Sequence, residues 1–206
     1  YYEPITFTQI YDQFDDLVVS RQSTMRVAIS EDTATVMNKM LQNVVYGSNG
    51  TGTAAASYIK DMKIYAKTGT SNNSNDLWFV GGTPYYVGSC WCGYDNPQEI
   101  SDSKIALKMW GSVMAKVHEG LEVKSFKESS YALDRYYCTE TGLRATDACP
   151  KKAVGWYKKN NVPAVCNKHE GKVLDSPKVM AEKEKQEAEK KQNAENAANA
   201  DNTTSQ

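Results

Sequence analysis

The stretch MKIYAKTGTSNNSNDLWFVGG, residues 62–82, decides the fold, because it places two strand patterns on either side of a polar turn. Residues 62–70 and 77–83 are rich in apolar, aromatic and β-branched side chains, whereas residues 71–76 carry the Ser, Asn and Asp that favour turns. A third strand pattern, residues 85–94, follows directly. Three strands joined by short turns predict an antiparallel meander.

Patterns on both sides of this stretch predict a hairpin and two helices. Residues 5–21 alternate and turn around residues 13–16, which predicts a β-hairpin. One helix is predicted from Ser30, a good N-cap residue, to the glycine-rich loop 47–52, and another over residues 101–118. The apolar stripes expected to face the core are Ala34, Met37, Leu41 and Val44 in the first helix, and Ile105, Met109, Val113 and Val117 in the second. Strands in sequence with flanking helices predict an α+β fold with an antiparallel sheet.

Composition divides the chain into three parts and excludes some partners. Residues 1–120 carry the strand and helix patterns, and residues 121–176 form a small turn-rich segment with three cysteines. Residues 177–206 are a polar tract predicted to be a solvated, disordered tail with transient helix. A net charge of −1 gives no electrostatic basis for binding nucleic acid or an anionic membrane. No apolar run approaches the roughly 20 residues of a membrane-spanning helix. The opening Tyr-Tyr-Glu-Pro, without Met, favours a piece of a longer protein.

Lys67, Thr68, Gly69 and Thr70 suit the binding of an anionic peptide end. If this strand lies at a sheet edge, an extended peptide could pair with its free backbone groups, and Gly69 would let that peptide approach closely. Lys67 supplies positive charge and the threonine hydroxyls supply donors for a carboxylate. The Thr70 N–H could donate to a carbonyl oxygen that gains charge, a contribution of about 3 kcal/mol in acyl transfer. The alternative is that Lys67 is a solvated edge lysine and the threonines are ordinary strand formers.

The region around this motif resembles the transpeptidase domain of class A penicillin-binding proteins, and the likeness runs from about Phe7 to His118. In that family, a Lys-Thr-Gly strand is followed by a polar turn, an Asp-x-Trp-Phe-Val-Gly strand, a Thr-Pro turn and a Trp-x-Gly-Tyr-Asp strand end. The Gly-Thr-Gly-Thr loop at residues 50–53 also matches. The other matching residues are Asp76, Trp78, Phe79, Val80, Gly81, Thr83, Pro84, Trp91, Gly93, Tyr94 and Asp95.

The resemblance implies the C-terminal part of a serine β-lactamase-like transpeptidase fold, and D,D-transpeptidation as its activity. Lys67, Thr68, Gly69 and Thr70 would then bind the carboxylate end of a peptidoglycan stem peptide, or of a β-lactam that mimics it. The Thr70 N–H would form half of the oxyanion hole, whereas Trp78 is expected to be a core aromatic. The resemblance implies no cofactor. It also implies an extracytoplasmic location, with a membrane anchor only in an upstream segment.

Two further motifs of the family are expected to lie outside this chain. Ser-x-x-Lys, for nucleophile and base, occurs literally at Ser57–Lys60 and Ser101–Lys104, and Ser-x-Asn occurs at Ser71–Asn73. None of them precedes the Lys-Thr-Gly strand at the distance that the family requires. We therefore expect the nucleophile upstream of this chain, and no turnover by the chain alone. Two other functions stay open: a serine β-lactamase-related hydrolase, and a non-catalytic remnant that binds wall peptide or a partner.

The five cysteines fall into two groups. Cys90 and Cys92 share one face of a strand and are expected to be buried thiols that pack as small apolar groups. Cys138 and Cys149 are expected to form a disulfide, because the compartment implied by the resemblance favours one. The alternative is a zinc site formed by Cys138, Cys149, Cys166 and His169, in which Cys-x-x-His is a plausible half-site.

Overall fold

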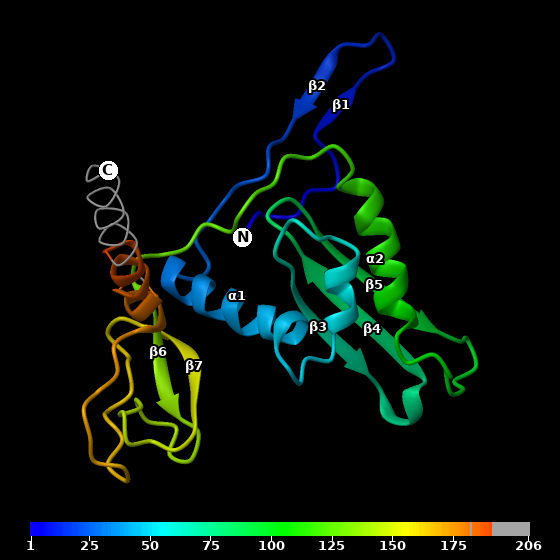
Figure 1. Ribbon diagram of the computed structural model, residues 1–206. Coiled ribbons are helices and arrows are strands. Elements are labelled where there is room, and N and C mark those ends of the chain that lie inside the picture. Colours follow the sequence, from blue (N-terminus) through cyan, green and yellow to red (C-terminus); the bar gives the residue numbers. More distant parts are fainter. Residues whose placement is uncertain (182, 191–206) are drawn as a thin grey trace, which may run out of the picture.

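The computed structural model describes residues 1–181 and 183–190, and the described chain has the predicted α+β architecture (Figure 1). The helices are α1 (Glu31–Tyr46), α2 (Ile105–Val117) and the short 3₁₀ turns η1 (Thr53–Ser57) and η2 (Asn72–Ser74). The strands are β1 (Gln9–Tyr11), β2 (Leu17–Ser20), β3 (Tyr65–Thr70), β4 (Asp76–Gly82), β5 (Val87–Gly93), β6 (Ala132–Cys138) and β7 (Lys152–Lys158). None of the described helices combines the length and apolarity needed to span a membrane.

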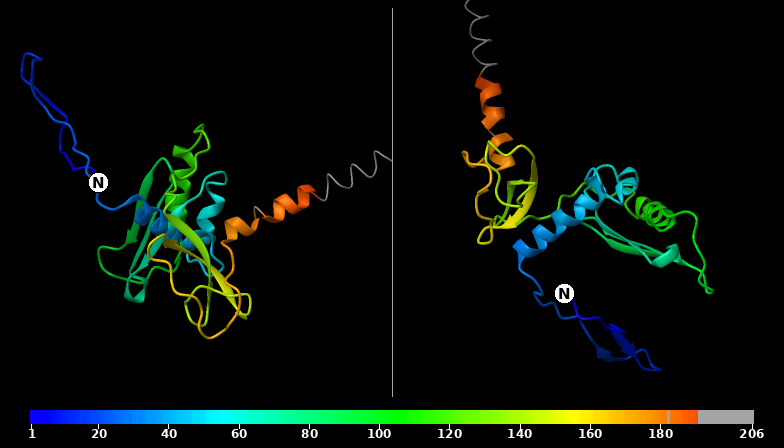
Figure 2. Two further views of the ribbon diagram at one scale, coloured as in Figure 1. Left: turned by 90° about the vertical axis from the view of Figure 1, so that its left-hand side faces the viewer. Right: turned by 90° about the horizontal axis from the view of Figure 1, so that it is seen from below.

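The central sheet confirms the predicted meander. Its strand order is β3-β4-β5, all antiparallel, with Lys67 opposite Val80 and Gly69 opposite Trp78. β3 is therefore an outer strand, and the strand that carries the motif has one free edge in this sheet. The predicted hairpin is also confirmed, because β1 pairs with β2. All residues of the two strands are exposed, and the hairpin projects away from the central sheet (Figures 1 and 2).

α2 covers one face of the central sheet through a buried tryptophan. The Trp110 side chain is 1% exposed, packs edge-on against Phe79 with ring centroids 5.0 Å apart, and donates a hydrogen bond from Nε1 to the Gly88 carbonyl at 3.1 Å. A Cβ at Gly81 would come within 3.0 Å of the Trp110 ring, so the missing side chain makes room for the indole. Large aromatic burial of this kind fixes the helix on the sheet.

The helix α2 is confirmed, but of its predicted core stripe only Ile105 packs, partly buried, against the core. Met109, Val113 and Val117 are exposed. The buried face is Ala106, Leu107, Trp110, Gly111 and Met114. Apolar residues occur on more than one side of this helix, and the face with the large indole and the close Gly111–Tyr58 approach packs inward.

The predicted stripe of α1 also differs from the observed one. Ala34 and Met37 are exposed, and the most buried residues are Thr35 and Val45. The Thr35 hydroxyl accepts a hydrogen bond from the Ser129 N–H at 3.0 Å. Thr35 is therefore covered by the segment after α2, whereas Val45 belongs to the core of the central domain. A helical period alone does not say which neighbours cover each part of a helix.

Residues 121–176 are here called the cysteine module. Their first part runs back along the central domain, where the centroid of the Phe126 ring lies 5.6 Å from that of the Tyr65 ring, and β6 and β7 then lie on the opposite side of α1 from the central sheet (Figures 1 and 2). β6 pairs antiparallel with β7. Lys158 of β7 lies 3.3 Å from the Asp32 carboxylate, and the Lys39 ammonium lies 4.6 Å from the centroid of the Trp156 ring. These contacts join the module to the α1 helix through charge and cation–π interactions.

The described part of the segment after the module is helical, which is the one structure that the composition predicts for it, at least transiently. Residues 177–181 and 183–190 form helix, whereas residues 191–206 lie outside the described residues. Ser176 accepts a hydrogen bond on its hydroxyl from the Val179 N–H at 3.2 Å, which is the arrangement of an N-cap. Ala, Glu and Lys favour helix strongly, so a capped start is enough to select it over the disorder that the composition also predicts.

Candidate active site

The Lys-Thr-Gly-Thr motif lies on the free edge of β3, with its backbone turned outward at alternate residues. The Lys67 ammonium donates a hydrogen bond to the Thr68 carbonyl oxygen at 2.7 Å, so that carbonyl faces away from β4. In an antiparallel ladder, the N–H and C=O groups of alternate residues point the same way. The N–H groups of Thr68 and Thr70 therefore face the open edge, where an added strand could pair with them.

A loop of the central domain lies beside this edge. The Thr51 and Thr68 hydroxyl oxygens are 2.8 Å apart and share a hydrogen bond. Thr51 belongs to the glycine-rich loop that follows α1, and sequence reasoning assigned it no role at the site. The sequence feature that could have pointed to Thr51 is its position in the Gly-Thr-Gly-Thr loop that matches the family.

Lys67 faces a hollow and not a convex surface. A cavity of about 840 Å³ lies between the loop after α1, β3 and the cysteine module. Lys67 is the one charged residue that lines it within the described part of the chain. Its lining residues are Met40, Asn43, Val44, Gly47, Ser48, Asn49, Gly50, Thr51, Lys67, Tyr137, Ala153 and Val154. The cavity combines a single cation with largely neutral walls, which favours an anionic group at one end of a mainly uncharged ligand.

The end of β3 is fixed by a small hydrogen-bond network in the following turn. The Asp76 carboxylate accepts hydrogen bonds from the Ser71 hydroxyl and the Trp91 Nε1–H, both at 3.0 Å. The Asp76 N–H donates back to the Ser71 hydroxyl at 2.8 Å. This network holds the turn at the residue after Thr70, and so limits the movement of the Thr70 N–H.

Two of the three serines that match the missing motifs, Ser57 and Ser71, make local hydrogen bonds. The Ser57 hydroxyl donates to the Ala54 carbonyl at 2.8 Å within η1, and Ser71 belongs to the network above. Trp78 is not a core aromatic as predicted: its side chain is 46% exposed, on the sheet face opposite α2, beside Trp91. Alternation along β4 explains this, since Leu77 and Phe79 take the buried face.

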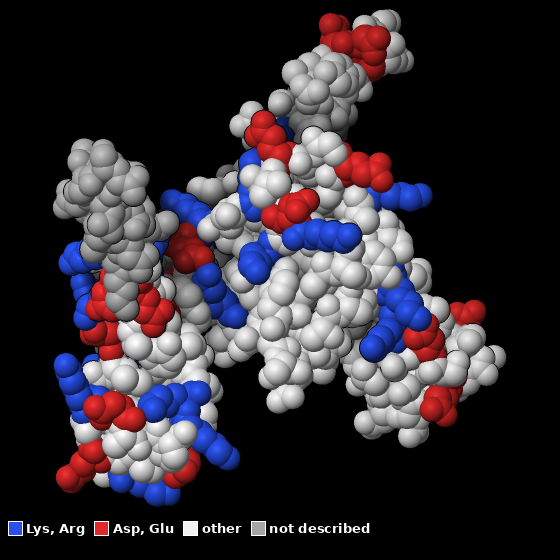
Figure 3. Space-filling model, viewed as in Figure 1, with Lys and Arg blue, Asp and Glu red and all other residues white. Residues whose placement is uncertain are grey.

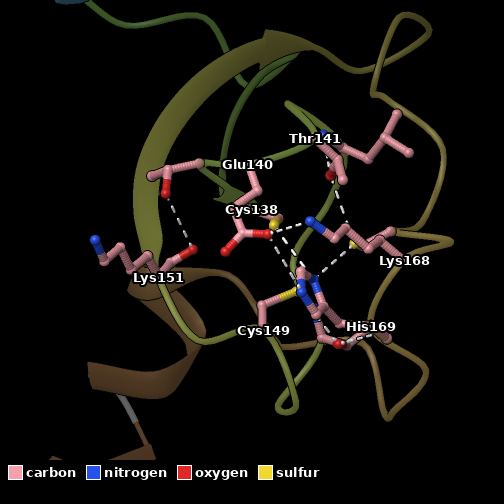
Figure 4. Close-up of polar contacts among 11 residues, drawn as sticks. Cys138, Glu140, Thr141, Cys149, Lys151, Lys168 and His169 are labelled. Atoms are coloured by element: carbon pink, nitrogen blue, oxygen red, sulfur yellow. Dashed lines mark hydrogen bonds and ion pairs between the residues drawn. The ribbon is translucent and has the colours of Figure 1, made fainter.

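Cys138, Cys149, Cys166 and His169 come together inside the cysteine module, with their candidate ligand atoms all within 4.8 Å of one another (Figure 4). All five cysteines are free thiols, so the expected Cys138–Cys149 disulfide is not formed in this structure. A hydrogen bond from the Thr141 hydroxyl, aided by backbone N–H groups, lowers the pKa of Cys166 to about 6. The hydrogen bond to Cys166 raises the pKa of His169.

Cys90 and Cys92 are separate from that group and pack partly buried against the core of the central domain. Burial raises the pKa of the Cys90 thiol, which keeps it protonated. They behave as small apolar groups, in keeping with the prediction that they pack.

An edge strand bearing Lys-Thr-Gly-Thr beside a hollow, on an antiparallel sheet covered by helices, defines the class of penicillin-binding, serine-enzyme folds. The family model described as "Penicillin binding protein transpeptidase domain" matches residues 1–109. This chain therefore belongs to the penicillin-binding protein transpeptidase family. The match agrees with the predicted extent of the likeness.

Relatives support the same assignment. Penicillin-binding protein 1A of Clostridium tetani is 24% identical over 179 residues, which cover 82% of this chain and 22% of the relative. Penicillin-binding protein 1A of Clostridium acetobutylicum is 34% identical over 125 residues, covering 60% of this chain and 15% of the relative. The crystal structure of penicillin-binding protein 1A from Haemophilus influenzae matches with a TM-score of 0.63 at 18% identity, covering 79% of this chain and 30% of that chain.

The matches cover only part of the relatives but reach beyond the central domain of this chain. The chain spans between 15% and 22% of the length of the two clostridial relatives. Because the C. tetani match covers 82% of this chain and the family model ends at residue 109, the likeness to that relative continues into the cysteine module.

Proposed function

We propose that this chain supplies the carboxylate-binding edge of a peptidoglycan D,D-transpeptidase. The observation that carries the proposal is the position of Lys67. Among the residues that line the cavity beside β3 in the described part of the chain, Lys67 is the charged one. Lys67 also lies on the same free edge as the N–H groups of Thr68 and Thr70. A substrate that ends in a carboxylate and can pair as a strand fits that edge.

The stem peptide of peptidoglycan has both properties. Its D-Ala-D-Ala end would extend along β3, with the terminal carboxylate held by the Lys67 ammonium and the Thr68 and Thr70 hydroxyls. The carbonyl oxygen of the penultimate D-Ala, where the serine attacks, would then accept a hydrogen bond from the Thr70 N–H. That donor stabilises the oxyanion as charge develops, by about 3 kcal/mol in comparable sites.

The reaction itself also needs a nucleophilic serine. In the proposed step, the serine oxygen attacks the carbonyl carbon of the penultimate D-Ala, and the bond to the terminal D-Ala breaks, releasing it as the amino acid. An amine of a second stem peptide then attacks the acyl-serine and frees the serine. We propose that polypeptide outside this chain supplies the nucleophile, and that the assembly works outside the cell membrane, where peptidoglycan is joined.

Labelling with a fluorescent penicillin tests the proposal. The label should attach covalently to the longer gene product that contains this chain, and not to the 206-residue chain alone. Labelling of neither protein would favour a non-catalytic binding module. Rapid hydrolysis of the drug by the longer product would favour a β-lactamase.

A further inference from the structure

The cysteine module contains a set of ligands arranged for a metal ion. The Sγ atoms of Cys138, Cys149 and Cys166 and the imidazole of His169 face a common centre, and the three cysteines are between 0% and 4% exposed. We propose that these four residues bind one zinc ion, which holds the module together beside the candidate active site.

The two distances from the histidine nitrogen to cysteine sulfurs match tetrahedral zinc. Zinc lies about 2.3 Å from cysteine sulfur and about 2.05 Å from histidine nitrogen, so a sulfur and a nitrogen on one tetrahedral ion are about 3.6 Å apart. The His169 Nδ1 atom lies 3.6 Å from the Cys138 Sγ atom and 3.5 Å from the Cys166 Sγ atom. A disulfide would instead join two sulfurs at about 2.05 Å and leave the third cysteine and the histidine without a common role.

The surroundings of the four ligands also suit a metal. With Nδ1 turned toward the sulfurs, the His169 Nε2 atom faces the Glu140 carboxylate at 3.5 Å, and Lys168 holds that carboxylate at 2.7 Å. Metal-binding histidines commonly give their second N–H to a carboxylate, which orients the ring. The Thr146 N–H points at the Cys149 sulfur at 3.3 Å.

Besides the β6–β7 pairing, the module has only a small apolar core. Its buried core cluster is Cys138, Ala145, Cys149 and Cys166, with Tyr136, Leu143 and Leu174 packed partly against it. Three of the four fully buried members are the proposed ligands. So small an apolar core gains little from burial, and a bound metal supplies the missing folding energy in modules of this kind.

The metal would also fix one wall of the cavity beside Lys67. Tyr137, which lines the cavity, is the residue before Cys138 on β6 and is paired with Ala153 of β7, another lining residue. Holding Cys138 therefore holds the end of the hairpin that faces the motif. The effect on the cavity wall follows from the pairing of Tyr137 with Ala153. The proposal that the module binds zinc does not depend on the proposed transpeptidase function.

Metal content tests the site directly. The 206-residue chain, expressed with zinc and purified with a reducing agent, should retain one zinc per chain by inductively coupled plasma mass spectrometry. Cys166→Ser should retain less than a tenth of that amount, whereas Cys90→Ser, a matched cysteine outside the module, should retain all of it. Equal zinc in Cys166→Ser and the unaltered chain would overturn the proposal.

Cobalt substitution keeps the test decisive if a variant does not fold. Co²⁺ bound to the unaltered chain should give the absorption bands of tetrahedral cobalt with a thiolate-to-metal charge-transfer band. Glu140→Gln should weaken metal binding about tenfold, because it removes the partner of the histidine ring. Absence of the charge-transfer band, or a Cys138–Cys149 disulfide found by mass spectrometry in protein purified without a reductant, would refute the zinc site. These metal measurements are independent of penicillin labelling, which remains the test of the proposed function.

Discussion

Replacing Lys67 with Ala should slow the acylation of the longer gene product by penicillin about 10- to 150-fold. The change removes the single charge lining the described cavity at the free edge of β3. A hydrogen bond between an ammonium and a carboxylate contributes about 1.5–3 kcal/mol, and each 1.36 kcal/mol changes a rate by about tenfold. Because the ammonium is exposed, its loss should change the free energy of unfolding by less than about 0.5 kcal/mol.

The assay is the rate of covalent labelling by a fluorescent penicillin, measured as a function of drug concentration. Lys60→Ala is the matched control: it removes an exposed lysine close to β3 but outside the cavity, and should label at the unaltered rate. A further readout is salt, since the advantage of the unaltered protein over Lys67→Ala should shrink as ionic strength screens the charge. Labelling by Lys67→Ala within twofold of the unaltered protein, with the same melting temperature, would refute the role given to the ammonium.

Three other predictions concern stability and the metal. Trp110→Ala should lower the free energy of unfolding of the chain by about 3–5 kcal/mol, measured by urea denaturation, because the indole is 1% exposed; Met109→Ala, on the exposed face of α2, should cost under about 0.5 kcal/mol. Removing metal with a strong chelator should expose residues 121–176 to limited proteolysis while the central sheet stays resistant, and uniform digestion would contradict this. Ser176→Ala should destabilise the following helix by about 1 kcal/mol and speed amide exchange at Val179; unchanged exchange would show that the hydroxyl is not its cap.

Among the described residues, the charge distribution on the face shown in Figure 3 includes no broad basic surface of the kind that binds a polyanion. Figure 3 shows lysine and arginine interspersed with acidic residues, and a central domain whose visible face is mostly uncharged. That pattern agrees with the net charge of −1. Selective attraction of a carboxylate then depends on where a lysine is placed, and not on the total charge.

Local patterns predicted the elements of the central domain well. The strands of the meander and the hairpin follow from alternation and turn residues, and α1 ends at Tyr46, just before the glycine-rich loop, as expected. The inward faces of both helices were missed. A helix with apolar residues on several sides leaves the choice to its neighbours, and for α2 that choice depends on the fit of Trp110 against Phe79 and Gly88.

The sequence by itself determined the family and the strand that carries the Lys-Thr-Gly-Thr motif, because this motif and the strands after it are contiguous. Only the tertiary structure decided two other features: the hollow beside Lys67, and the meeting of Cys138, Cys149, Cys166 and His169 at one centre. Both depend on segments far apart in the chain. Spacing along a sequence limits how far two residues can be separated, but the packing of the intervening chain decides which of them meet.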